Sequence, residues 1–200
     1  MTRIGVLGGT FDPFHIGHLA AASVAIECAH LERVIFIPAA QPPHRPPAVA
    51  SVQDRLAMCK LATSGDARFA VSDVEVKRAG PSYTAETLEE LRKLHPDAEL
   101  FLVLGWDAAS PFHTWHRPER VRELASMVIV SRPGSTAPQA ADLQSAGLDG
   151  TGVVVCLGHT PDVSASEVRR AVSAGESIAG MVPEAVDHYI KAHHLYAGAA

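Results

Sequence analysis

The 200-residue sequence has few cysteines, no long apolar run and no excess of positive charge. Its three cysteines, Cys28, Cys59 and Cys156, are odd in number and widely spaced, which argues against a disulfide framework or a zinc site. Each lies in an apolar stretch, so we expect buried thiols in a reducing compartment. The formal net charge is -5 without a long basic run, which argues against duplex binding as the main function.

The sequence also lacks the signs of export or membrane insertion. The stretch after Met1 is too short for the apolar core of a signal peptide. No apolar run approaches the ~20 residues that span a bilayer. The apolar fraction of 47% and the charged fraction of 20% are those of an ordinary globular protein. We therefore expect a cytoplasmic protein with one domain over residues 1–200.

Short apolar runs alternate with amphipathic stretches along the chain. We expect strands at residues 4–7, 34–37, 69–76, 100–104, 127–130 and 153–157. We expect helices at residues 17–31, 51–63, 84–94, 164–172 and 183–193, and loops at 39–50 and 134–152, the second a surface excursion. This alternation predicts an α/β fold, a Rossmann-like doubly wound and mostly parallel sheet with helices on both faces. Such sheets bind ligands at the carboxyl ends of their strands.

The segment from Gly8 to His18 follows the first strand and reads G-G-T-F-D-P-F-H-I-G-H. Paired glycines let a backbone approach a ligand, and a helix that begins near Gly17 directs free N–H groups toward the same place. His15 and His18 are three residues apart, which puts both imidazoles on one face of a helical turn. The segment is neither a Walker A loop nor a dinucleotide fingerprint. Taken alone, the two histidines are explained by the start of a helix. A metal pair is a further option, but no third ligand is spaced nearby.

A second candidate anion site lies between Val163 and Arg169, in the sequence V-S-A-S-E-V-R. Ser164 and Glu167 have the spacing of a capping box, which is a sufficient structural explanation by itself. A helix start with two hydroxyl groups and an arginine also suits phosphate, because N–H donors, the helix dipole and a guanidinium converge there.

Both segments resemble motifs of one superfamily, the nucleotidyltransferases with an HxGH motif. The early segment is similar to their G-G-T-F-D-P-x-H-x-G-H signature, and the late one to their I-S-S-T-x-I-R motif, with Ala165 in place of the second Ser. The resemblance implies that three residues are catalytic, hold the triphosphate and stabilise the transition state: His15, His18 and Arg169. It also implies a set of ATP-binding residues: Gly8, Gly9, Thr10, Phe11, Gly105, Asp107, Ser164 and Ser166.

The middle of the chain resembles one branch of that superfamily, the nicotinate-nucleotide adenylyltransferases. The matching stretches are G-P-S-Y-T-A-E-T-L from Gly80, G-W-D from Gly105, T-W-H-R from Thr114 and R-P-G from Arg132. Trp106, in the second of these stretches, is bulkier than the small residue expected there. With a similar C-terminal helix at 189–196, the resemblance runs from residue 4 to residue 196, apart from 134–152.

This branch binds an acceptor with a pyridine ring, and the predicted acceptor-binding residues are Asp12, His44, Arg45, Thr84, Trp115 and His116. Trp115 offers a flat face for the ring. Backbone N–H groups of Thr84 and His116 suit a ring carboxylate better than an uncharged amide. Asp107 can accept from ribose hydroxyls, and His44 with Arg45 can hold the acceptor phosphate. Packing, capping or solvation explains each residue equally well when it is considered alone.

Together these features predict an adenylyltransferase that transfers AMP from ATP to nicotinate mononucleotide, giving deamido-NAD and pyrophosphate in NAD biosynthesis. Mg²⁺ would accompany ATP, held through phosphates and water, with no metal site on the protein. We expect no nucleic-acid or membrane partner, and the sequence leaves open whether the protein forms a homo-oligomer. The alternatives are an adenylyltransferase for another phosphorylated acceptor such as phosphopantetheine, a non-catalytic nucleotide-binding module, and a metal hydrolase built on the two histidines.

Overall fold

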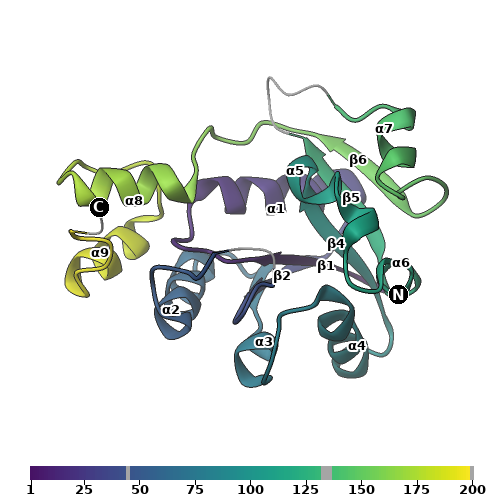
Figure 1. The fold of residues 1–200 in the computed structure, drawn as a ribbon, viewed down its shortest axis with the longest axis horizontal. Coiled ribbons are helices and arrows are strands. Elements are labelled where there is room, and N and C mark those ends of the chain that lie inside the picture. The colour runs from purple at the N-terminus through teal and green to yellow at the C-terminus, as the bar shows by residue number, and fades with distance from the viewer. Residues whose placement is uncertain (44–45, 132–136, 199–200) are drawn as a thin grey trace.

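The computed structural model describes residues 1–43, 46–131 and 137–198 (Figure 1). Its centre is a six-stranded sheet in the order β3-β2-β1-β4-β5-β6, in which every neighbouring pair is parallel. The strands are β1 (Thr2–Gly9), β2 (Arg33–Pro38), β3 (Phe69–Val71), β4 (Ala98–Gly105), β5 (Ser126–Ser131) and β6 (Val153–Leu157). The predicted doubly wound α/β fold is confirmed, and its switch point lies between β1 and β4.

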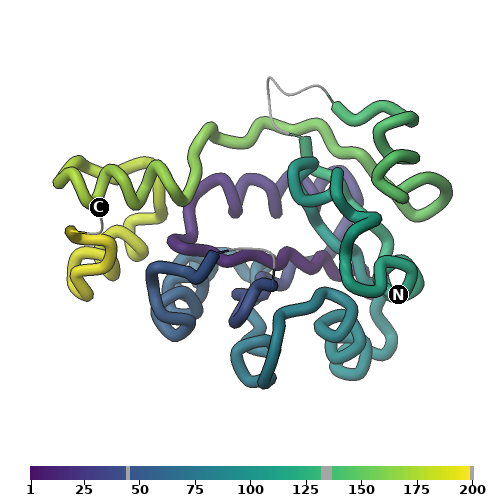
Figure 2. Tube along the Cα trace, in the orientation of Figure 1, coloured from purple at the N-terminus to yellow at the C-terminus, as the bar shows by residue number. Residues whose placement is uncertain are grey.

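Helices cover both faces of the sheet. The core on one face includes residues of α1 (Ile16–Ala29), α2 (Val52–Thr63), α8 (Ala165–Ser173) and α9 (Glu184–Ala192). The core on the other face includes residues of α3 (Val74–Lys77), α4 (Thr84–Leu94), α5 (Trp106–Ala109), η1 (Phe112–Thr114), α6 (Pro118–Leu124) and α7 (Ala140–Ser145). In the tube of Figure 2, α9 near the C-terminus lies beside α2. Within the described residues, no helix combines the length and apolar character that a membrane span requires.

Adjacent side chains along each strand enter opposite cores, because the side chains of a strand alternate between its two faces. On β1, Val6 belongs to one core and Leu7 to the other. The central strands β2 and β5 are buried at nearly every position, as expected for a parallel sheet covered on both sides. Each fully buried Val, Leu or Ile side chain contributes about 1.5–3 kcal/mol through removal of apolar surface from water.

Two predicted elements differ from the structure. The strand expected at 69–76 ends at Val71, and the short helix α3 follows it. From Asp73 the backbone turns into a helix instead, because the Lys77 N–H donates to the Asp73 carbonyl oxygen at 2.9 Å. The loop expected at 134–152 contains α7 in its described part and buries Leu148 completely. Ala146 and Leu148 anchor this part to the core, whereas α7 itself has no buried residue. Its single short helix is too brief to show a period.

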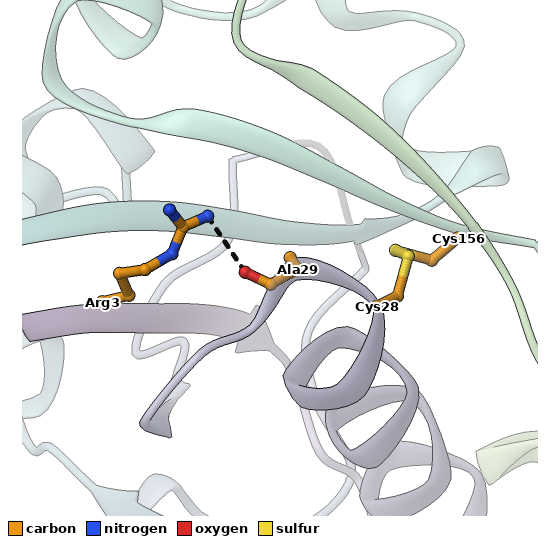
Figure 3. The surroundings of a disulfide bond; sticks show 4 residues. All are labelled: Arg3, Cys28, Ala29 and Cys156. Atoms are coloured by element: carbon orange, nitrogen blue, oxygen red, sulfur yellow. Dashed lines mark hydrogen bonds between the residues drawn. A yellow bond between two sulfur atoms is a disulfide. The ribbon is translucent and has the colours of Figure 1, made fainter.

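The cysteines also differ from expectation, because Cys28 and Cys156 form a disulfide (Figure 3). Cys28 lies near the end of α1, where Arg3 Nη2 donates to the Ala29 carbonyl oxygen at 3.0 Å. Cys156 lies on β6, 128 positions further along the sequence, yet the two Cα atoms are 5.9 Å apart. The two cysteines are far apart in the sequence and meet only because α1 packs directly against β6, so their spacing does not predict the pair. Cys59 is a buried free thiol, as predicted.

Candidate active site

Two cavities lie at the carboxyl end of the sheet, where β1 and β4 diverge. The histidine cavity has a volume of about 200 Å³, and its lining includes Gly8, His15, Gly17, His18, Gly105, Thr160, Pro161 and Val163. The tryptophan cavity has a volume of about 560 Å³, and its lining includes Gly9, Thr10, Glu75, Ser82, Tyr83, Thr84, Thr87, Asp107, Trp115 and His116. Gly8, Leu104 and Ala108 line both cavities. The two cavities therefore adjoin at the switch point of the sheet, the place where such folds bind ligands.

His15 and His18 are stacked at the start of α1, with ring centroids 3.6 Å apart and an angle of 24° between the planes. The shared face that their spacing predicts is therefore present. The backbone N–H of His15 donates to His18 Nδ1 at 3.1 Å. Because Nδ1 accepts this hydrogen bond, the hydrogen of a neutral His18 ring is on Nε2, where it can serve as a donor. The N–H groups of the first turn of α1 add a positive dipole end beside the ring.

Gly17 lies between the two histidines, at a position where a side chain would be tight. A Cβ atom on Gly17 would lie 3.0 Å from His15 Nδ1 and 3.3 Å from Val163 Cγ1. A methyl group would therefore displace either the His15 ring or the segment that leads into α8. The glycine lets His15 and Val163 pack closely in the wall of the histidine cavity. This packing role adds to the close approach of backbone and ligand that the sequence predicts.

The Phe11 side chain lies beneath the site. Its ring is 2% exposed and packs edge-on against His18, with centroids 4.8 Å apart. Phe11 lines neither the histidine cavity nor the tryptophan cavity. Apolar packing buries this ring under the imidazole, and the predicted ATP contact of Phe11 stays a prediction.

Asp12 also lines neither cavity, and its predicted acceptor contact stays a prediction. Its carboxylate accepts hydrogen bonds from the Val49 N–H at 2.7 Å, the Ala50 N–H at 3.1 Å and the Tyr196 hydroxyl at 2.8 Å. A carboxylate that is 5% exposed needs such donors to offset its lost hydration. Through these hydrogen bonds the Asp12 side chain holds the loop after β1 in place.

Arg55 on α2 supports the same loop. It is 2% exposed and donates to the carbonyl oxygens of Thr10 at 2.6 Å and Ala39 at 2.7 Å. Burial lowers the pKa of Arg55, and the negative charge of Asp12 opposes that shift. Through these bonds one buried guanidinium ties the loop after β1 to the loop after β2.

Arg169 brings the late motif against the early one. Its Nη1 donates to the Asp12 carbonyl oxygen at 2.6 Å, and its Nη2 donates to Ser166 Oγ at 3.3 Å. Ser164 caps α8, since its hydroxyl accepts from the Glu167 N–H at 3.2 Å and donates to Glu167 Oε2 at 2.8 Å. The Ser164 hydroxyl and the Ser164 N–H both donate to this carboxylate and lower the pKa of Glu167. The predicted capping box is confirmed, and neither Ser164, Ser166 nor Arg169 lines the histidine cavity.

The tryptophan cavity brings together several of the predicted acceptor residues. Trp115 lines it while its ring packs on Phe112, with centroids 5.3 Å apart. His116 stacks on Tyr83 at 4.1 Å between centroids. Thr84 is the first residue of α4, and Tyr83 rather than Thr84 is the N-cap residue, so the capping interpretation of Thr84 is wrong. The Thr84 N–H is one of the first N–H groups of α4, which lack a partner within the helix.

Ser82 and Glu75 are two of the lining residues of this cavity that were not among the predicted site residues. Ser82 Oγ accepts from the N–H groups of Ala40 at 3.0 Å and Gln41 at 3.1 Å, which joins the turn before α4 to the loop after β2. Glu75 is 7% exposed, and its Oε1 accepts from Thr87 Oγ1 at 2.7 Å. Burial raises the pKa of Glu75, and the Ser82 and Thr87 hydroxyls oppose the shift. The only sign of this buried carboxylate in the sequence is that Glu75 stands between two valines.

The comparisons with known proteins agree with this geometry. A family model described as cytidylyltransferase-like matches residues 6–171. A probable nicotinate-nucleotide adenylyltransferase of Thermus thermophilus is 45% identical, over 97% of this chain and 99% of the relative. One of Thermomicrobium roseum is 43% identical, over 98% of this chain and 92% of the relative.

The chain belongs to the nicotinate-nucleotide adenylyltransferase family. The fold has a solved counterpart in the nicotinic acid mononucleotide adenylyltransferase of Plasmodium falciparum complexed with NaAD. That structure has a TM-score of 0.79 and 17% identity, over 98% of both chains.

Two positions depart from the family motifs. Trp106 begins α5, packs partly buried against the core on that face of the sheet, and lines neither cavity. Its bulk is therefore taken up by the core. Ala165 is the first residue of α8, between the capping Ser164 and Ser166. The hydroxyl that the family has at this position is missing, and the two flanking serines retain theirs.

The remaining predicted site residues divide between the cavities. Gly105 lines the histidine cavity, whereas Gly9, Thr10 and Asp107 line the tryptophan cavity. His44 and Arg45, predicted to hold the acceptor phosphate, lie outside the described residues. Across the described ranges, no group of three or more His, Cys, Asp or Glu side chains could hold a metal ion.

Proposed function

We propose that the protein transfers the AMP part of ATP to nicotinate mononucleotide, forming deamido-NAD and releasing pyrophosphate. The observation that carries this proposal is that the histidine and tryptophan cavities adjoin at Gly8, Leu104 and Ala108. A triphosphate beside the histidines and a flat ring beside Trp115 can therefore meet. The names of the relatives support this acceptor, and the Plasmodium falciparum structure is a complex with NaAD.

The reaction we propose is a direct displacement at the α-phosphorus of ATP. An oxygen of the acceptor phosphate forms the new bond, the bond to the β-phosphate oxygen breaks, and pyrophosphate leaves with its electron pair. No covalent enzyme intermediate is required. The task of the protein is then to position the two phosphates and to stabilise the charge that develops between them.

We assign charge stabilisation to His15, His18 and Arg169. The Nε2–H of His18 is suited to a phosphoryl oxygen, and the dipole of α1 reinforces it. Arg169 holds the loop through the Asp12 carbonyl and, in this proposal, uses its remaining N–H groups for the leaving phosphates. Ser164 and Ser166 stand at the same helix start and are proposed to assist it.

For the acceptor, we assign the pyridine ring to Trp115 and the ring carboxylate to the N–H groups of Thr84 and His116. Asp107, in the same cavity, is suited to accept hydrogen bonds from ribose hydroxyls. His44 and Arg45 are proposed for the acceptor phosphate.

Mg²⁺ is proposed to enter with ATP as part of the substrate. The donor set of the site fits this view, because the described residues offer imidazole and guanidinium donors rather than a carboxylate cage. Bound to the phosphates, the ion would supply neutralisation of their negative charge.

The test is pyrophosphate release from Mg–ATP with a panel of acceptors. The panel contains nicotinate mononucleotide, nicotinamide mononucleotide, phosphopantetheine and no acceptor. We expect the highest kcat/KM with nicotinate mononucleotide. A higher kcat/KM with phosphopantetheine would replace the acceptor, while nucleotide binding without turnover on any acceptor would favour a non-catalytic nucleotide-binding module.

A further inference from the structure

The segment 115–117, which joins η1 to α6, packs against the first turn of α4. His116 from this segment lines the tryptophan cavity together with Tyr83 and Thr84 at the start of α4. The proposed function takes one N–H group from each side, from Thr84 and from His116, for the ring carboxylate of the acceptor. The distance between these two N–H groups therefore depends on how the segment is held against α4.

Two residues at the start of α4 contact the His116 ring. The ring stacks on Tyr83, with centroids 4.1 Å apart and an angle of 27° between the planes. At the edge of the ring, His116 Nε2 lies 3.4 Å from Glu86 Oε1. Tyr83 is the N-cap residue of α4, and Glu86 lies in its first turn. Both contacts therefore come from the same turn that contains the Thr84 N–H.

Glu86 also contacts the residue that follows His116. Arg117 Nη1 lies 3.6 Å from Glu86 Oε1, and Arg117 Nη2 donates to Glu89 Oε1 at 3.2 Å. Arg117 has a left-handed backbone conformation, with a φ of 54°. This conformation is unfavourable for a residue with a side chain and persists where surrounding contacts hold it. The turn after His116 therefore depends on the carboxylates of α4.

Glu86 and Glu89 are matched in position and differ in their contacts. They lie three residues apart on α4, and their side chains are 31% and 29% exposed. The printed partners of Glu89 are Arg117 and Arg120, whereas Glu86 contacts His116 as well as Arg117. Ion pairs with this much exposure contribute little to stability. A special role of Glu86 is therefore expected in the geometry of His116 rather than in the stability of the fold.

We infer that Glu86 is a positioning residue, which acts through His116 and fixes the distance between the two N–H groups that receive the ring carboxylate of the acceptor. The inference rests on the proposed function, because it takes nicotinate mononucleotide as the acceptor. Glu86 itself does not line the tryptophan cavity, so it acts on the acceptor only through its neighbours. Without Glu86, the Thr84 N–H keeps its place at the start of α4 and the His116 N–H shifts away from it.

A carboxylate and an amide respond differently to such a shift. The ring carboxylate of nicotinate mononucleotide has two equivalent oxygens, one for each N–H group. The amide of nicotinamide mononucleotide has one acceptor oxygen, and its NH₂ group only donates. Hydrogen bonds to a charged acceptor are also the stronger ones. A wrong distance between the two N–H groups therefore weakens binding of the acid more than binding of the amide.

The measurement is the ratio of kcat/KM for nicotinate mononucleotide to kcat/KM for nicotinamide mononucleotide at one pH. Both acceptors are assayed on the same preparation, so any unfolded fraction of a variant cancels in the ratio. Glu86→Ala should lower the ratio by about tenfold, the scale of one lost hydrogen bond to a charged group. The KM for ATP should stay within about twofold, because Glu86 does not line the histidine cavity.

Two further variants of these α4 carboxylates separate positioning from a general loss of charge. Glu89→Ala removes the matched carboxylate, which pairs with Arg117 and Arg120, and should keep the wild-type ratio. Glu86→Gln keeps an oxygen beside His116 Nε2 and should recover most of the ratio that Glu86→Ala loses.

A double-mutant cycle tests whether Glu86 acts through His116. His116→Ala removes the ring that Tyr83 and Glu86 contact but keeps the backbone N–H. It should lower the ratio by itself, and the addition of Glu86→Ala should change the ratio by no more than about twofold. Independent effects that multiply would show that Glu86 acts by another route, and would overturn the inference.

The remaining outcomes separate the inference from the proposed function. An unchanged ratio in Glu86→Ala, an equal fall in Glu89→Ala, or no recovery in Glu86→Gln would overturn the inference and leave the proposed function intact. Equal losses of kcat/KM with both acceptors leave the ratio unchanged and overturn it likewise. A wild-type protein that turns over neither acceptor, or that does not prefer the acid, would overturn the proposed function and the inference with it.

Discussion

Arg169 Nη1 donates a 2.6 Å hydrogen bond to the carbonyl oxygen of Asp12, a residue 157 positions earlier in the chain. This bond joins the motif at the start of α8 to the motif after β1. The Asp12 carboxylate accepts in turn from Tyr196, near the C-terminus. Three distant segments thus meet beneath the histidine cavity, and the geometry of its loop depends on all of them.

The first prediction concerns His18. Replacing it by alanine (His18→Ala) removes the Nε2 donor and the acceptor of the His15 N–H, and we expect kcat to fall by ~100-fold or more, the cost of one lost transition-state contact. The measurement is steady-state pyrophosphate release. His188→Ala is the matched control, because that side chain is 70% exposed on α9 and should leave kcat unchanged. A near-normal kcat for His18→Ala would remove His18 from the mechanism.

The second prediction concerns the ring platform. Trp115→Ala should raise the KM for nicotinate mononucleotide by about tenfold, because a lost stacking partner costs about 0.5–1.5 kcal/mol beyond the buried area. The KM for ATP should stay within about twofold, since Trp115 does not line the histidine cavity. Trp115→Phe keeps an aromatic face and should recover most of the loss. Equal changes in both KM values would indicate that Trp115 supports the fold rather than the acceptor.

The third prediction concerns the C-terminal tyrosine. Tyr196 is 4% exposed, and Tyr196→Phe leaves the buried Asp12 carboxylate with one donor fewer. We expect the free energy of unfolding to fall by about 1–3 kcal/mol, measured by urea denaturation. Tyr189→Phe is the comparison, with a smaller expected loss because its partner Asp54 is only partly buried.

The same hydroxyl gives this prediction a pH dependence. Burial and then the charge of Asp12 raise the pKa of Tyr196 above its ordinary value. A group whose pKa is raised on folding contributes its full stability below its unfolded pKa, here about 10. The difference between wild type and Tyr196→Phe should therefore stay constant from neutral pH to about pH 9. A difference that disappears within that range would contradict the assigned hydrogen bond.

The fourth prediction concerns the three cysteines. Titration with a thiol reagent should find no reactive thiol in the folded, non-reduced protein, because Cys28 and Cys156 are joined and Cys59 is buried with a raised pKa. Unfolding without a reductant should expose one thiol, and unfolding with a reductant should expose three. Three thiols in the unfolded, non-reduced protein would show that the disulfide is absent.

The sheet could be predicted from the sequence because its strands are continuous apolar runs, such as Val153–Leu157, that need no tertiary information. The helix at Thr84–Leu94 was predicted with its observed bounds because a full amphipathic pattern ends before Pro96. The α3 and α7 helices were missed because neither is long enough to show a helical period. Pairing of Cys28 with Cys156 depends on how α1 crosses the sheet, which no local pattern encodes.

In the candidate site, too, some features could be predicted from the sequence and others could not. His15 is the extended N-cap residue of α1 and His18 is the third residue of the helix, so the three-residue spacing in the sequence brings the two rings together at the helix start. The hydrogen bonds of the Asp12 carboxylate depend on its donors Val49 and Tyr196, which come from distant segments, so the sequence pattern alone could not predict them. Glu75 was missed for a related reason, because its position in the cavity depends on the short helix that replaced part of an expected strand.

The proposed AMP transfer is tested most directly by following the α-phosphorus of ATP. The protein is incubated with nicotinate mononucleotide, Mg²⁺ and ATP labelled either at the α- or at the γ-phosphate. We predict that the α label appears in a dinucleotide that forms only when the acceptor is present, and that the γ label appears in pyrophosphate. Recovery of the α label as free AMP, or as unchanged ATP, with no labelled dinucleotide would contradict the proposed transfer.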